Sequence, residues 1–234
     1  MKEYIQQLTG TFSHYARTID YTMIPAVNTL SRSQAKPTTQ TLLEADQLLE
    51  YASRHPNNKL IFEASDMQLK CQYDASLHTL IDGRSVIGDI KYLGNYNDPP
   101  EKVQNVFDAS STVLNAVAAH IVEAEYGSAF HCGQQAYFYG IVLEALGFTQ
   151  RYIEFYGDNN IAVGISNDSV KVKRAKAIEK SYHWFRDKCR RKEFKSMHIK
   201  GLYNTSDFMT KPLPKARHNL LAPNLVSVTN MKGN

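Results

Sequence analysis

Residues 68–74 read Gln-Leu-Lys-Cys-Gln-Tyr-Asp, a stretch in which every second side chain is apolar or aromatic and the last is acidic. Such alternation is typical of a β-strand with one buried face. Residues 85–93 show a similar pattern, and residues 113–119 supply a third apolar segment. With a polar loop expected over residues 95–108, these three strands fit an antiparallel meander.

The order of elements beyond this meander predicts the rest of the sheet. Apolar and aromatic side chains recur at helical spacing over residues 122–146, and Gly147 is suited to end that helix. Further along we expect a strand at 152–156, a short helix at 159–166, a long basic helix at 172–191, a strand at 194–199 and a last short helix at 205–210. This order predicts an α/β fold, a mixed five-stranded sheet flanked by helices.

The N-terminal part has a different, all-helical texture. Helices are expected over residues 4–15 and 25–30 and from Thr38 or Thr39 onward, and the His-Pro-Asn-Asn sequence from residue 55 ends the third. Residues 60–62 form a short strand candidate, and little pattern follows residue 219. We therefore predict an N-terminal all-helical appendage over residues 1–58, the α/β domain over residues 59–217 and a tail over residues 218–234.

Composition narrows the class of protein. Hydrophobic residues make up 43% of the 234 residues, which is ordinary for a globular chain. No apolar run approaches the roughly 20 residues needed to span a bilayer, and the first residues lack the layout of a signal peptide. The cysteines, Cys71, Cys132 and Cys189, are odd in number and form no CxxC pair. This argues against a disulfide framework or a zinc site and favours a reducing compartment.

Positive charge is concentrated in one segment. Residues 171–200 hold 12 Lys or Arg against three acids, although the net charge of the whole chain is only +4. Such an excess fits either a polyanionic partner or a solvated helix face. Helical spacing would turn Tyr182, Trp184 and Phe185 inward and leave the basic side chains outside.

Four acids fall where a shared metal site could form. Asp74 closes the first strand, Glu125 lies in the first turns of the long helix, Asp158 directly follows the fourth strand, and Asp207 opens the last short helix. Clustered carboxylates repel one another unless cations neutralise them, and Mg²⁺ prefers such oxygen ligands. Each acid also has a structural alternative as a turn, cap or solvated helix residue, and Glu123 competes with Glu125.

The motifs around these acids resemble a known family, the ribonuclease H domain of copia-type retrotransposon polyproteins. The resemblance covers about residues 66–217. It is carried by Gln-Tyr-Asp-Ala-Ser at 72–76, Glu-Ala-Glu-Tyr at 123–126, Leu-Glu-Ala-Leu-Gly-Phe at 143–148, Tyr-Gly-Asp-Asn-Asn at 156–160, the basic segment at 173–187 and Thr-Ser-Asp-Phe-Met-Thr-Lys-Pro-Leu at 205–213. Residues 1–56 resemble the end of the reverse transcriptase that precedes this domain, without its paired-aspartate motif.

The resemblance implies a metal-dependent nuclease that cuts the RNA strand of an RNA–DNA hybrid during reverse transcription. It implies two Mg²⁺ or Mn²⁺ ions held by Asp74, Glu125, Asp158 and Asp207, with Glu125 preferred over Glu123 because the family's ligand directly precedes an aromatic or aliphatic residue, here Tyr126. The implied partners are the hybrid and the remainder of a Pol polyprotein with its reverse transcriptase, with no membrane. A cytoplasmic location, with a virus-like particle as a further context, follows only from the life cycle of such an element.

Further residues are candidates for supporting roles. His198, on or just after the last strand, is a candidate for proton transfer, with a packed strand histidine as the alternative. Asn159 and Asn160 are candidates to contact the minor groove of a bound nucleic acid. Candidates to contact its phosphates are Lys173, Arg174, Lys176, Lys180 and Arg191.

Departures from the family leave a second hypothesis open. Ser76 stands where a second acid or small polar residue is common, and residues 118–122 replace a Ser-Ser-Thr run. No ligand is removed by these changes. The alternative is a catalytically inactive nucleic-acid-binding or scaffold remnant of a retroelement polyprotein, and a third, weaker one is another nuclease or DNA transferase on the same fold.

Overall fold

The computed structural model describes residues 1–170 and 180–228, which group into two compact units. One unit consists of residues 1–61 together with the chain from residue 214 onward, and the other of residues 62–213. The C-terminal segment, expected to be a separate tail, is therefore grouped with the N-terminal helices.

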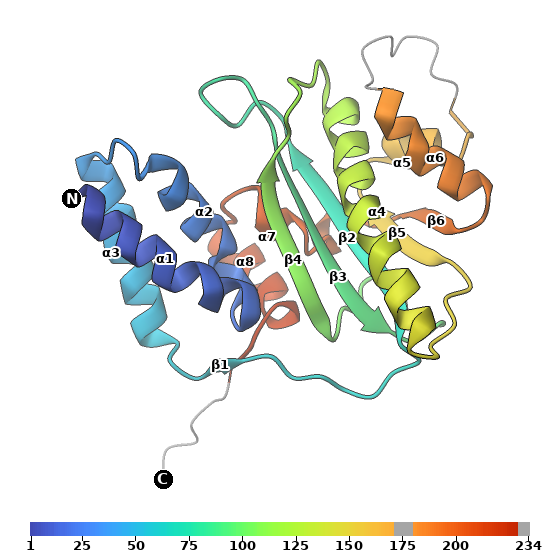
Figure 1. The fold of residues 1–234 in the computed structure, drawn as a ribbon, viewed down its shortest axis with the longest axis horizontal. Helices are drawn as coiled ribbons and strands as arrows, with labels where there is room; N and C mark the ends of the chain where they lie inside the picture. Colours follow the sequence, from blue (N-terminus) through green and yellow to red (C-terminus); the bar gives the residue numbers. More distant parts are fainter. Residues whose placement is uncertain (171–179, 229–234) are drawn as a thin grey trace. The chain divides into compact units, whose positions relative to one another are not determined.

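The second unit is built on a mixed five-stranded sheet with the strand order β4-β3-β2-β5-β6. Its strands, drawn in Figure 1, are β2 (Gln68–Ser76), β3 (Val86–Gly94), β4 (Val106–Val113), β5 (Ile153–Gly157) and β6 (Phe194–His198). β4, β3 and β2 pair antiparallel, whereas β5 and β6 join β2 in parallel. The predicted fold class, a mixed five-stranded sheet flanked by helices, is confirmed.

The apolar face of this sheet is covered by α4 (Ile121–Ala145), the longest helix in Figure 1. The alternating side chains of β2, Leu69, Cys71 and Tyr73, are fully buried in the core beneath it. Three elements contact α4: α5 (Asn160–Ser166), η2 (Lys180–Tyr182) and α6 (His183–Arg190). Along the chain, β6 is followed by η3 (Gly201–Tyr203) and α7 (Asp207–Thr210). Of the three aromatic residues expected to face inward, Tyr182 and Phe185 are buried and Trp184 is partly buried against the same core.

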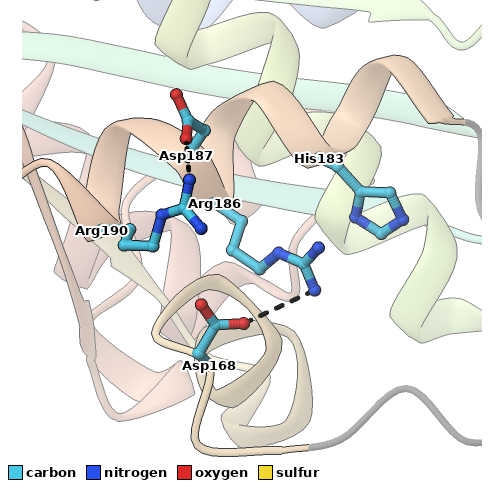
Figure 2. Close-up of a pocket in the computed structure, with 5 residues that line it drawn as sticks. All are labelled: Asp168, His183, Arg186, Asp187 and Arg190. Atoms are coloured by element: carbon cyan, nitrogen blue, oxygen red, sulfur yellow. Dashed lines mark hydrogen bonds and ion pairs between the residues drawn. The ribbon is translucent and has the colours of Figure 1, made fainter.

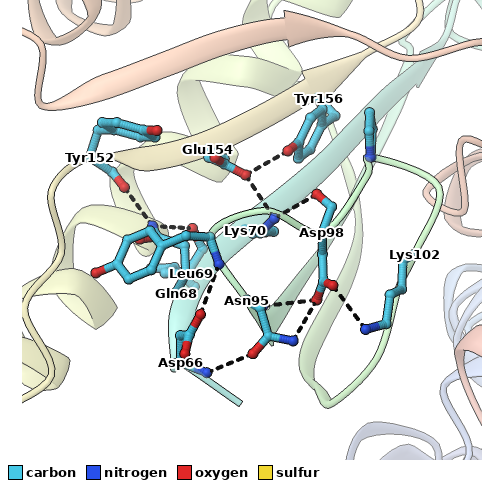
Figure 3. A network of polar contacts seen from close by, with 12 residues as sticks. Asp66, Gln68, Leu69, Lys70, Asn95, Asp98, Lys102, Tyr152, Glu154 and Tyr156 are labelled. Atoms are coloured by element: carbon cyan, nitrogen blue, oxygen red, sulfur yellow. Dashed lines mark hydrogen bonds and ion pairs between the residues drawn. The ribbon is translucent and has the colours of Figure 1, made fainter.

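The opposite face of β2 carries buried polar side chains, shown in Figure 3. The fully buried Lys70 ammonium lies 3.1 Å from a Glu154 carboxylate oxygen and donates to the Asp98 carbonyl oxygen at 3.1 Å. The Tyr156 hydroxyl donates to the same Glu154 carboxylate at 2.5 Å. A buried charge is costly unless it is paired and hydrogen-bonded. This network therefore favours the register in which Lys70 of β2 lies beside Glu154 of β5.

The helical unit contains α1 (Lys2–Thr18), η1 (Tyr21–Met23), α2 (Ile24–Ser33), α3 (Thr39–Arg54), β1 (Asn58–Lys59), α8 (Lys215–Leu221), η4 (Ala222–Asn224) and β7 (Ser227–Val228). Thr38 caps α3 in a capping box with Thr41. The buried Asp20 carboxylate accepts from the Asn58 amide at 2.6 Å, and β1 pairs antiparallel with β7. The pairing of β1 with β7 explains why the C-terminal segment belongs to this unit.

Three elements predicted from the sequence differ from those in the structure. The third strand is not residues 113–119 but β4, residues 106–113, the first three of which had been assigned to a polar loop. No strand forms at residues 60–62; the two-residue strand β1 lies directly before them. The described part of the predicted basic helix at 172–191 is the 3-10 turn η2 followed by α6. None of the helices in the described ranges is long and apolar enough to cross a membrane.

Candidate metal centre

Three of the four candidate acids converge at one end of the sheet. Asp74 lies near the end of β2, Asp158 directly follows the neighbouring parallel strand β5, and Glu125 projects from the second turn of α4. Carboxylate oxygens of these three residues all lie within 4.8 Å of one another. Asp74 and Glu125 are buried and Asp158 is half-buried, so the group opens to solvent on the Asp158 side.

The structure separates the two candidate glutamates of α4. Glu123 accepts a hydrogen bond from the Ala119 backbone N–H at 2.7 Å, which ties the first turn of the helix to the residue before its N-cap, His120. Glu125 instead faces the acid cluster, and its buried Oε2 atom has no hydrogen-bond partner among the described residues. A buried carboxylate oxygen without a donor is costly, and a bound cation would remove that cost.

Asp207 is brought beside Asp74 by the docking of α7 on the sheet. The buried Asn204 amide donates to the Tyr73 carbonyl oxygen at 3.1 Å, and the Thr205 N–H donates to Gln72 Oε1 at 2.7 Å. These contacts place the first turn of α7 against β2. The Thr210 hydroxyl then donates to the Asp74 carboxylate.

A lysine that follows α7 contacts two of the acids. The Lys211 ammonium lies 2.7 Å from Asp207 Oδ1 and 3.6 Å from Asp74 Oδ2. Neither Lys211 nor Thr210 was among the site residues predicted from the sequence. The signal for Lys211 was its place four residues after Asp207, because side chains at that spacing share one face of a helix.

The charges of the cluster act strongly on one another. Burial raises the pKa of the Asp74 carboxyl above its ordinary value, and the charge of Asp207 raises it further. Burial, followed by the charges of Asp74 and Asp158, also raises the pKa of Glu125. Burial by itself would lower the pKa of Lys211, but the carboxylates of Asp74 and Asp207 outweigh that effect and raise it. The cluster therefore resists full ionisation in the absence of a cation.

The donor set fits a divalent cation of the Mg²⁺ or Mn²⁺ type. All the converging ligand atoms are carboxylate oxygens, which such hard ions prefer, and the half-buried Asp158 leaves room for water ligands. The free cysteines lie elsewhere, with Cys71 and Cys132 buried in the apolar core. The residues present thus suit a magnesium site.

The predicted supporting residues lie at varying distances from the cluster. His198 ends β6 and is exposed, with its Nε2 atom 3.2 Å from the Asp158 carbonyl oxygen. Asn159 caps α5 by accepting from the N–H groups of Ile161 and Ala162, and Asn160 is exposed. Of the basic residues, Lys180 and Arg191 are exposed, whereas Lys173, Arg174 and Lys176 lie outside the described residues.

A separate polar pocket lies between the end of α5 and α6, as Figure 2 shows. Arg186 is 3.5 Å from Asp168, and Arg190 is 2.8 Å from Asp187. Burial lowers the pKa of the fifth lining residue, His183, and the nearby Arg186 charge lowers it further. Because its two arginines are compensated by two aspartates, this pocket lacks the unbalanced negative charge that a metal site requires.

Solved structures with a similar fold are polymerase and ribonuclease proteins. A foamy viral protease-reverse transcriptase in complex with an RNA/DNA hybrid aligns with a TM-score of 0.55 and 13% identity, over 100% of this chain and 27% of that chain. The same viral enzyme in complex with dsDNA aligns with a TM-score of 0.54 and 10% identity, over 85% of this chain and 38% of that chain. LC11-RNase H1, isolated from compost, aligns with a TM-score of 0.46 and 18% identity, over 62% of this chain and 93% of that chain.

The strand order and the flanking helices define a mixed five-stranded α/β fold, and the alignments to the foamy viral protease-reverse transcriptase show that this fold is shared with that enzyme. No protein-family model matches the chain. A homologue is the retrovirus-related Pol polyprotein from transposon TNT 1-94 of Nicotiana tabacum, which is 27% identical over 195 residues. The match covers 83% of this chain but only 14% of the polyprotein. It confirms the resemblance to a retrotransposon Pol polyprotein that the motifs had indicated.

Proposed function

We propose that this chain is a metal-dependent ribonuclease that cuts the RNA strand of an RNA–DNA hybrid during reverse transcription. The observation that carries the proposal is the convergence of Asp74, Glu125 and Asp158 within 4.8 Å on a ribonuclease H-like sheet. A nuclease of this kind needs ionised oxygens held in place before substrate arrives, and two strands and a helix supply them here.

Each acid has a proposed task. Asp74, Glu125, Asp158 and Asp207 would hold two Mg²⁺ or Mn²⁺ ions, which when bound supply an activated water and charge stabilisation at the departing 3′ oxygen. Thr210 orients the Asp74 carboxylate through its hydroxyl hydrogen bond. His198, exposed beside the Asp158 backbone, is the candidate for moving a proton at the edge of the cluster.

The hybrid would be held by groups around the acids. A hybrid offers 2′-hydroxyl groups in a shallow minor groove, which side-chain amides such as those of Asn159 and Asn160 can contact. Lys180 and Arg191, both exposed, would contact phosphates without reading sequence. The foamy viral protease-reverse transcriptase, which has a similar fold, was solved in complex with an RNA/DNA hybrid, and this supports the choice of substrate.

The proposed setting is a larger Pol polyprotein that contains a reverse transcriptase. The tobacco homologue is a retrovirus-related Pol polyprotein, and this chain matches 14% of it. We propose that the helical unit is the end of the polymerase portion, and that the protein works in the cytoplasm where reverse transcription of such elements takes place.

The test is cleavage of an RNA–DNA hybrid labelled on each strand in turn, with Mg²⁺ or Mn²⁺. The full chain should cut only the RNA strand, and an Asp158→Asn variant, which keeps the shape of the side chain but removes its charge, should lose the activity. Hybrid binding without cleavage in the unsubstituted chain would favour the inactive remnant. Equal cleavage by the variant would show that the site is misplaced or that a contaminant is active.

A further inference from the structure

We propose that Lys211 is an internal counter-ion of the acid cluster, and that a divalent ion bound between Asp74 and Asp207 displaces its ammonium group. This inference rests on the proposed function in one respect, namely that the cluster binds a divalent ion. It assigns a positioning role to a residue outside the predicted ligand set.

The contacts of Lys211 place its charge where a cation would be needed. Its ammonium lies 2.7 Å from Asp207 Oδ1 and 3.6 Å from Asp74 Oδ2. Both carboxylate side chains are only 3% exposed, so water contributes little to neutralising them. The Lys211 backbone N–H also donates to the Asp207 carbonyl oxygen at 3.3 Å, which fixes the base of the side chain close to the cluster.

The lysine can nevertheless leave the site. Its side chain is 43% exposed, so the flexible stem has solvent on one side into which the ammonium can turn. The Thr210 hydroxyl holds Asp74 independently and can keep this carboxylate in place when the lysine moves. A lysine paired with two buried acids but open to water is therefore suited to an exchangeable role.

The Lys211 ammonium and a divalent ion compete for the same oxygens of Asp74 and Asp207, and their like charges repel each other. Unit charges about 4 Å apart repel strongly wherever water does not screen them fully. An ion that ligates Asp74 and Asp207 must therefore displace the ammonium and break its contacts. Lys211 is expected to stabilise the ion-free protein and, by the same contacts, to weaken ion binding.

The experiment compares the full chain with a Lys211→Met variant in EDTA and across an Mg²⁺ titration, using the unfolding temperature and titration calorimetry. In EDTA the variant should melt about 2–4 °C lower, because the acids lose their counter-ion. Its half-saturating Mg²⁺ concentration should fall by roughly threefold to tenfold, since no ammonium has to be displaced. Saturating Mg²⁺ should remove the difference in unfolding temperature.

Lys102 provides a matched control. Its ammonium pairs with Asp98 at 2.9 Å, also at a spacing of four residues, and its side chain is 46% exposed. Lys102→Met should leave the Mg²⁺ midpoint unchanged. Lys211→Arg, which keeps the charge, should bind Mg²⁺ as the unsubstituted chain does, and Lys211→Gln can replace the methionine variant if that fails to fold.

The outcomes separate this inference from the proposed activity. A shifted Mg²⁺ midpoint in a protein that cuts no hybrid would uphold the role of Lys211 and reject the nuclease. Equal midpoints for Lys211→Met and the unsubstituted chain would overturn the displacement, as would an equal shift in Lys102→Met. Absence of any Mg²⁺ binding would overturn it as well, since the lysine would then be a permanent partner.

Discussion

At the scale of single residues, the candidate site is a set of like charges that the fold forces together. Glu125 is 3% exposed, and one of its carboxylate oxygens has no hydrogen-bond donor among the described residues. Because burial and the charges of Asp74 and Asp158 raise the pKa of Glu125, folding without metal favours its protonated form. The protein therefore carries a local instability that a bound cation would relieve.

Neutralising this glutamate is expected to stabilise the ion-free protein. Because the pKa values of Asp74 and Glu125 are raised by folding, the folded state in EDTA keeps protons on these carboxyls that the unfolded state has already released. The free energy of unfolding should therefore fall as the pH rises from about 5 toward 8. Glu125→Gln should weaken this slope, raise the free energy of unfolding at pH 8 by at least about 1 kcal/mol, and lower the affinity for Mg²⁺. Urea unfolding at several pH values checks the expectation.

Glu123→Gln is the control for this change. It alters a second buried glutamate of the same helix, one that accepts a hydrogen bond from Ala119. It should cost about 1 kcal/mol by weakening this hydrogen bond and should leave the Mg²⁺ response in place. If the two variants behaved alike, the separate roles given to the two glutamates would be refuted.

At the scale of elements, the position of Asp207 depends on the contact between α7 and β3. A Cβ atom at Gly88 would lie 2.4 Å from the Met209 Cβ and 2.9 Å from the Thr210 Cγ2. Only glycine lets the two backbones approach this closely. The last acid is therefore placed by a packing contact that is distant from it in sequence.

Gly88→Ala should move α7 outward and disturb the metal site indirectly. We expect a loss of about 1–3 kcal/mol in stability from overpacking, together with weaker Mg²⁺ binding because Asp207 shifts away from Asp74. Gly10→Ala, where no atom lies within 4 Å of the added carbon, should leave Mg²⁺ binding unchanged and slightly stabilise α1. Unaltered Mg²⁺ binding in Gly88→Ala would count against this account of how Asp207 is positioned.

The elements also show what sequence alone can predict. The strands β2, β3, β5 and β6 and the helix α4 were predictable because their apolar side chains recur at the spacing of a strand or a helix, although the polar side chains of β2 are buried as well. β4 was missed because its start, through Asp108, was assigned to a polar loop, although Asp108 and Ser110 pair with Lys91 and Asp89 of the neighbouring β3. The acids at strand and helix ends could be predicted from their order, whereas Lys211 and Gly88 matter only through contacts that the docking of α7 creates.

At the scale of the whole molecule, the main hydrophobic cluster is contained in one unit. Every buried residue of the main hydrophobic cluster lies between Leu69 and Phe194, inside the unit of residues 62–213. The strand pair of β1 and β7 lies outside it and ties the two terminal segments of the helical unit to each other. This arrangement suggests that the sheet unit can fold without the helical one.

A fragment of residues 62–213 is accordingly expected to unfold cooperatively and to gain thermal stability from Mg²⁺ in the same way as the full chain. Circular dichroism during heating, in EDTA and in Mg²⁺, measures both properties. A fragment that binds Mg²⁺ only when the helical unit is restored would show instead that the site depends on both units.

Binding of a polyanion involves the molecule's charge as a whole, and its salt dependence reports how many phosphates are contacted. In an Asp158→Asn background, which should bind without cleaving, replacing both Lys180 and Arg191 by Ala should weaken hybrid binding and reduce the salt slope by about 2, because each cation releases roughly one counter-ion. Arg54 is the matched control for Arg191, since each arginine pairs with an acid four residues earlier and their side chains are 70% and 63% exposed. Fluorescence anisotropy with a labelled hybrid at several salt concentrations gives the slopes.

If Arg54→Ala lowered the slope as much as Arg191→Ala, the positive charge would act only as a diffuse field. A selective loss would instead place the nucleic-acid path along the exposed side of α6.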